Sequence, residues 1–87
     1  MKPSICRDVV VHGFPSNGVI EQPAKITRVW GDGDTAEGPV MVNVTVFPDG
    51  GQPIPRGSVR LYESRDEALA VQTVTNDPMV AYWPPRV

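Results

Sequence analysis

Residues 39–51 read Pro-Val-Met-Val-Asn-Val-Thr-Val-Phe-Pro-Asp-Gly-Gly, and they are the clearest indication of the fold in the chain. Valine recurs at every second position, at Val40, Val42, Val44 and Val46. Side chains with this period point to one face of an extended strand. In the Pro-Asp-Gly-Gly that follows, proline restricts φ, the aspartate side chain can bond its own backbone, and glycine accepts positive φ. The stretch therefore predicts a strand that runs into a tight turn, and with it a small β protein.

The rest of the chain predicts further short elements of the same kind. Strands are expected over residues 6–14, 24–30, 39–47, 57–62 and 79–83. Gly13 indicates a bulge or a close backbone approach within the first strand. In the second strand the alternation of Ile26, Val29 and Trp30 is imperfect, which indicates a bulge or a strong bend. Ser64 and Glu67 form a capping box, so we expect one or two helical turns over 65–71.

These elements predict the architecture of the whole chain. We expect one all-β domain over residues 1–87, a small SH3-like, partly open five-stranded barrel with one short helical turn before the last strand. In the strand at 57–62, Val59 and Leu61 point inward, and Arg60 and Tyr62 point outward. Cys6 is expected to be a small buried hydrophobe.

Composition narrows the classes of function. The 87 residues leave room for one domain. A net charge of −2, from 8 basic and 10 acidic residues, supplies no field for collecting phosphates, which disfavours a nucleic-acid-binding barrel. A single cysteine excludes an intramolecular disulfide. Neither a signal-peptide pattern nor a long apolar run is present, so we expect a protein of a reducing cytoplasm that binds no membrane.

Neither catalysis nor metal binding is predicted. His12 is the single histidine, and no nucleophile elbow accompanies it, so we interpret it as a strand-edge side chain with one hydrogen bond. Asp32, Asp34 and Glu37 lie in an acidic, glycine-rich loop without the ligand pattern of a calcium site, and we interpret them as solvated. No cofactor is expected.

The aromatic residues and their arginine neighbours are the most useful candidates for a binding site. The aromatic side chains are Phe14, Trp30, Phe47, Tyr62, Tyr82 and Trp83. Some of them must fill the core, and the others can offer stacking surfaces with a polar handle. Arginines beside them can pair an anion or stack on a ring. The candidate ligand- or partner-binding residues are Arg28, Trp30, Arg60, Tyr62 and Trp83.

Three phrases of the chain occur together in one family. They are Pro-Ala-Lys-Ile-Thr-Arg-Val-Trp at 23–30, Val-Asn-Val-Thr-Val-Phe-Pro-Asp-Gly at 42–50 and Trp-Pro-Pro-Arg-Val at 83–87. In these the chain resembles a family of small uncharacterised bacteriophage and prophage proteins, which have the phrases "VTKVW", "VNLTVFPDGG" and "WHWPERV". The chain departs from that pattern in the acidic loop 31–38 and at Ala81-Tyr82. The resemblance implies a phage origin and carries no activity or site residue.

Two hypotheses of function follow from this combination. In the first, the chain is a non-enzymatic accessory protein in the host bacterial cytoplasm, which blocks a host factor or sequesters a small anionic molecule such as a nucleotide defence signal. Arg28 or Arg60 would pair the phosphate, Trp30, Tyr62 or Trp83 would stack, and the site would lie between copies of a homo-oligomer. In the second, the chain is a virion component, a capsid decoration or head–tail connector protein that docks on capsid or tail proteins.

Overall fold

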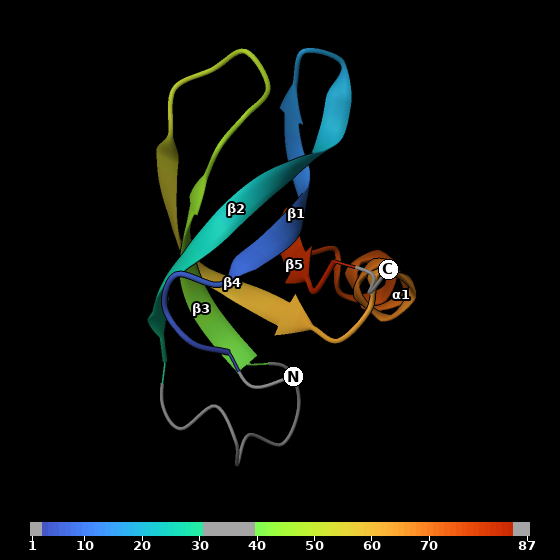
Figure 1. Ribbon diagram of the computed structural model, residues 1–87. Coiled ribbons are helices and arrows are strands. Elements are labelled where there is room, and N and C mark those ends of the chain that lie inside the picture. Colours follow the sequence, from blue (N-terminus) through green and yellow to red (C-terminus); the bar gives the residue numbers. More distant parts are fainter. Residues whose placement is uncertain (1–2, 31–39, 85–87) are drawn as a thin grey trace.

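The computed structural model describes residues 3–30 and 40–84, and these form a β-barrel with one helix (Figure 1). The elements in chain order are β1 (Asp8–Ser16), β2 (Val19–Val29), β3 (Val40–Val46), β4 (Ile54–Tyr62), α1 (Arg65–Thr75) and β5 (Val80–Tyr82). The predicted acidic loop, with Asp32, Asp34 and Glu37, lies outside the described residues.

The five strands form a closed barrel in the order β1-β2-β3-β4-β5. Strands β1 to β4 pair as antiparallel neighbours, and β5 pairs in parallel with β4 and antiparallel with β1. The all-β barrel with a helix before its last strand is confirmed, but the expectation that it is partly open is wrong. Three residues are enough to close it, because both sides of β5 pair: Ala81 lies opposite Leu61 of β4 and opposite Val11 of β1.

The core lies inside the barrel and is dominated by valine. The alternating valines of β3 behave as predicted, since Val42, Val44 and Val46 are each 1 % exposed or less. They pack with inward residues of the other strands and with the Trp83 ring. Each such buried side chain contributes about 1.5–3 kcal/mol relative to an exposed one.

Gly13 marks a bulge in β1, as its sequence context indicates. The register with β2 shifts between His12 and Ser16, and Gly13 has a φ of +115°. A Cβ atom built on Gly13 would lie 2.0 Å from the carbonyl oxygen of Pro78. Glycine is therefore required on two grounds, backbone conformation and space. Beyond the bulge Phe14 packs against the same core cluster as the valines before it.

A second bulge in β2 explains the imperfect alternation there. The β2–β3 register shifts between Ile26 and Arg28. Ile26 is buried, and after the shift Val29 packs against the core while Trp30 is 41 % exposed. The bulge or bend predicted from these residues is confirmed as this register shift.

Helix α1 covers the outside of the barrel over β4 and β5. The Ser64 Oγ accepts from the amide of Glu67, as the capping box predicts, and Asn76 ends the helix in the left-handed region. Ala68 of the helix packs in a second apolar cluster whose barrel residues are Tyr62, Val80 and Tyr82. Figure 1 shows the helix beside β5, on the flank of the barrel. The helix runs four residues further than expected, to Thr75.

The ends of the two hairpins β1–β2 and β3–β4 are joined by polar contacts. The buried side chain of Gln22 donates to the carbonyl oxygens of Ser16 and Val19 and accepts from the amide of Asp49. Asn17 Nδ2 also donates to the carboxylate of Asp49, at 2.9 Å. Both hairpins project from the same end of the barrel in Figure 1, and these bonds hold their tips in register.

Cys6 does not behave as predicted, because it is exposed. The chain turns at this residue, with a φ of +70°, and β1 begins only at Asp8. Cys6 therefore lies before the alternating part of the strand, where its backbone amide donates to the carbonyl of Ile26 and its side chain faces solvent.

Candidate functional site

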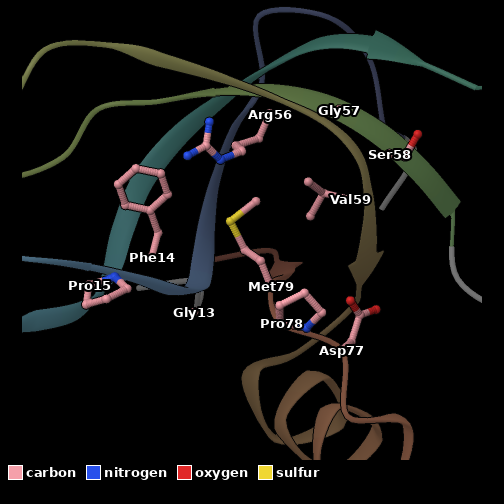
Figure 2. Close-up of a pocket in the computed structure, with 10 residues that line it drawn as sticks. All are labelled: Gly13, Phe14, Pro15, Arg56, Gly57, Ser58, Val59, Asp77, Pro78 and Met79. Atoms are coloured by element: carbon pink, nitrogen blue, oxygen red, sulfur yellow. The ribbon is translucent and has the colours of Figure 1, made fainter.

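A cavity of about 470 Å³ opens where β5 begins (Figure 2). Strand β5 separates β1 from β4, and its first residue, Val80, lies opposite His12 and Arg60. Beyond those two positions β1 and β4 continue without a strand between them. The gap is lined by residues of β1 (13–15), of β4 (56–59) and of the segment 77–79. The shortness of β5 is therefore the origin of the cavity.

The lining is mostly apolar and carries one side chain of each charge. Val59 and Met79 point into the cavity, and the Phe14 ring lies along the β1 side (Figure 2). The Arg56 guanidinium carbon lies 5.0 Å from the centre of the Phe14 ring, within cation–π range. Asp77 lines the far side of the cavity from that pair. Such a pocket can hold an apolar or planar body and orient it by a few polar groups.

Both charged side chains have hydrogen-bonding atoms that a ligand could use. The exposed Arg56 donates from Nη1 to the carbonyl oxygen of its neighbour Pro55, at 3.0 Å. Among the residues that the structure describes, no carboxylate pairs with this guanidinium and no group donates to the Asp77 carboxylate. The site thus holds an unpaired cation and an unpaired carboxylate on a shared apolar surface.

The segment 77–79 is held in place by a chain of hydrogen bonds. The Gln72 Nε2 donates to the carbonyl oxygen of Asp77 at 3.0 Å, which fixes the orientation of the amide. Its Oε1 then accepts from Nδ1 of His12, 2.9 Å away. His12 thus has the hydrogen bond expected of it, and its role is to tie β1 to the helix. Together with the close approach of Gly13, these bonds fix one wall of the cavity.

Of the predicted site residues, Arg28 and Trp30 lie together on the outer face of the barrel. The Arg28 guanidinium carbon is 3.9 Å from the centre of a Trp30 ring. The Trp30 Nε1 donates to Asn43 Oδ1 at 2.8 Å, and the same oxygen accepts from the amide of Ser58. The indole is therefore fixed in place, and Arg28 already stacks on it.

Arg60 and Tyr62 line a different cavity, of about 450 Å³, between β4 and the start of α1. Tyr62 points outward from the barrel as predicted, but the helix covers it and leaves it 4 % exposed. Its hydroxyl is buried and has no hydrogen-bond partner among the described residues. Trp83 belongs to the barrel core at 6 % exposure. The five predicted residues thus form two separate pairs and one core residue, and not a single site.

The cavity of about 470 Å³ lined by residues 13–15, 56–59 and 77–79 is named the Phe14–Arg56 pocket, after its ring and its guanidinium. The sequence does not single out the residues of this pocket. Arg56 precedes the predicted strand at 57–62, and Asp77 lies between the predicted helix and the last strand. Gly13 is the one signal of the pocket in the sequence, because a close backbone approach requires another segment beside it. The sequence does not say which segment this is, and the structure identifies it as 78–79.

Neither a metal centre nor a spanning helix is found in residues 3–30 and 40–84. Within these ranges no three side chains of the histidine, cysteine, aspartate or glutamate type gather in a way that could hold a metal ion. The one helix there, α1, is too short and too polar to cross a membrane.

No protein-family model, curated protein or solved structure matches this chain. The fold and the geometry of the Phe14–Arg56 pocket are therefore the grounds on which a function can be argued.

Proposed function

We propose that this chain is a non-enzymatic binding module of phage origin, which sequesters a small anionic ligand in the Phe14–Arg56 pocket. The observation that carries the proposal is the Arg56 guanidinium at 5.0 Å from the Phe14 ring, beside a cavity of about 470 Å³. Small-molecule sites typically measure roughly 300–1,000 Å³ and combine an apolar lining with a few polar groups.

The charge state of Arg56 supports an anion as the ligand. A guanidinium remains protonated at physiological pH and offers a fork of donors that fits a phosphate or a carboxylate. Because no described carboxylate pairs with Arg56, an incoming anion has no competing carboxylate to displace. The Phe14 ring beside it supplies a flat apolar surface for the rest of the ligand.

Binding without catalysis is the role that suits this lining. Its ionisable side chains are Arg56 and Asp77, and His12 is bonded to Gln72 by Nδ1. A nucleophile with a base and an orienting group, as covalent catalysis requires, is not part of the lining. We therefore assign the module an action by occupancy, in the infected cell.

The experiment is native mass spectrometry of the protein purified gently from the cells that make it, with the Arg56→Gln variant beside it. We expect a fixed mass excess of a few hundred daltons on the wild type, and its loss from the variant. Arg7→Gln is the matched control, since Arg7 is an exposed arginine outside the pocket lining. An excess that persists on Arg56→Gln would contradict the site.

Absence of any bound small molecule would contradict sequestration and turn attention to a macromolecular partner, a host factor or the virion. Peptide mass spectrometry of purified phage particles then distinguishes the two. A virion component is present in stoichiometric copies, whereas an accessory protein is absent from the particle.

A further inference from the structure

The Phe14–Arg56 pocket carries opposite charges on its two sides. Figure 2 shows Arg56 and Phe14 on one side, Asp77 on the other, and the side chains of Val59 and Met79 between them. This arrangement is more selective than a cationic pocket, because a ligand must satisfy both ends and an apolar middle.

We infer that Asp77 makes the pocket selective for a ligand with a single anionic group at one end and an aromatic ring with N–H donors at the other, the chemistry of a nucleoside monophosphate with an amino-bearing base. The inference rests on the proposed function, since it takes Arg56 as the group that holds the anion. Asp77 then acts as the specificity-determining residue.

The hydrogen-bonding state of Asp77 is the first support. An ionised carboxylate only accepts hydrogen bonds, and none of the described residues donates to this one. Its main-chain oxygen is held by Gln72 Nε2 at 3.0 Å, and Pro78 follows it, so the backbone that presents the carboxylate is fixed. A half-buried acceptor on a fixed backbone suits a ligand that brings donors.

The charge balance is the second support. A second anionic group near Asp77 would be repelled, so a polyphosphate fits less well than a single phosphate. A base with adjacent ring and exocyclic N–H groups, such as guanine, can donate two parallel hydrogen bonds to one carboxylate. Its ring would lie on the apolar surface of Val59 and Met79, with the phosphate directed to Arg56.

The test compares two probes that share a phosphate, a ribose and a purine ring. Guanosine 5′-monophosphate carries N–H donors on its base, and purine riboside 5′-monophosphate carries none. Dissociation constants are measured for both on the wild type, Asp77→Asn, Arg56→Gln and the control Asp66→Asn, whose aspartate is exposed on α1. Backbone amide chemical shifts of Gly13, Phe14 and residues 56–59 report whether each probe binds in the pocket.

On the wild type and on Asp66→Asn we expect guanosine monophosphate to bind at least about tenfold more tightly than purine riboside monophosphate, as charge-assisted hydrogen bonds imply. Asp77→Asn should remove this preference and leave the weaker probe unaffected or slightly tighter. Arg56→Gln should weaken both probes.

Equal affinities on the wild type, or an unchanged preference on Asp77→Asn, would overturn the inference. If Arg56→Gln still weakened both probes in that case, the proposed anion site would stand. If neither probe shifted the pocket amides, both the inference and the anion site would be overturned.

Discussion

Replacing Gly13 by alanine tests the packing that builds the pocket. The residue has a φ of +115°, and an added Cβ would lie 2.0 Å from the Pro78 carbonyl oxygen. An L-residue at positive φ costs about 1–2 kcal/mol. Separating β1 from Pro78 to relieve the clash costs a further 1–3 kcal/mol or so, as overpacking does elsewhere.

The loss of entropy in the unfolded chain offsets this by about 0.4–1 kcal/mol. We therefore expect Gly13→Ala to lower the free energy of unfolding by about 2–4 kcal/mol. That is a large part of the stability of a small domain. Urea denaturation followed by tryptophan fluorescence measures the change, since Trp83 lies in the core.

Gly50→Ala is the matched control. Its φ is +75°, and no atom of the described residues lies within 4 Å of the position of an added Cβ, so it reports the backbone contribution without a clash. We expect it to cost roughly 0–1.5 kcal/mol. If Gly13→Ala cost no more than Gly50→Ala, β1 would not approach Pro78 closely, and the origin assigned to the cavity wall would be refuted.

Four further predictions concern the remainder of the barrel. Tyr62→Phe should leave stability unchanged or raise it by about 1 kcal/mol, because it removes an unpartnered buried hydroxyl. Tyr82→Phe should lower the free energy of unfolding by about 1–3 kcal/mol, because the Tyr82 hydroxyl donates to the Glu21 carboxylate. Thermal unfolding of the two variants would contradict both predictions if Tyr62→Phe proved less stable than Tyr82→Phe. Asn43→Ala should lower the free energy of unfolding by about 1–3 kcal/mol and redshift tryptophan emission, because Asn43 Oδ1 accepts from both the Trp30 indole and the Ser58 amide. An unchanged emission spectrum would show that other contacts hold the Trp30 indole. The hydrogen bond to Asp8 raises the pKa of Lys25 above its ordinary 10.5, so the pair stabilises the fold below that pH and the contribution is lost as the pH rises through the raised pKa. Denaturation of Asp8→Asn and wild type at pH 8 and pH 11 should show a difference at pH 8 that shrinks at pH 11, and a constant difference would be inconsistent with it.

Local sequence patterns predicted those elements in which the residue types reflect the immediate environment of each side chain. The valines of β3 alternate because one face is buried, and the serine of the capping box bonds an amide three residues away. The bulge at Gly13 could be predicted because a glycine within a strand often accompanies a bulge or a close backbone approach. In the first two cases the interaction is short-range along the chain or is a periodicity of burial, and in the third the glycine itself marks the position although its neighbour Pro78 is distant in sequence.

The first hairpin shows where such patterns mislead. The gap between the strands predicted at 6–14 and 24–30 implies a loop from Pro15 to Pro23, but Asn17 and Gly18 form a two-residue turn at positive φ, and β2 begins at Val19. Asn-Gly is a strong signal for this turn, and the polar residues and the proline after it conceal the strand. Pro23 lies in β2 opposite Val10, and its carbonyl oxygen accepts from the amide of Phe47.

The candidate site required contacts that no local pattern contains. Arg56 and Asp77 line opposite sides of a gap that exists because β5 is short. The position of this gap depends on the register in which the barrel closes. Tyr62 alternates outward as predicted, but its burial depends on where α1 docks. Trp83 comes directly after β5, and only the tertiary fold places its ring in the core.

The pairing of β5 with β1 governs the order in which the barrel can form. Strands β1 to β4 can form one after another through neighbouring hairpins, but His12 must find Val80 from across most of the sequence. Contacts between such distant residues slow folding, because the entropy of loop closure is lost before the contact contributes. Until the three residues of β5 are in place, β1 and β4 keep unpaired edges to which another chain can add. Folding of the barrel is therefore complete only when β5 docks, and aggregation should compete with folding mainly before that step.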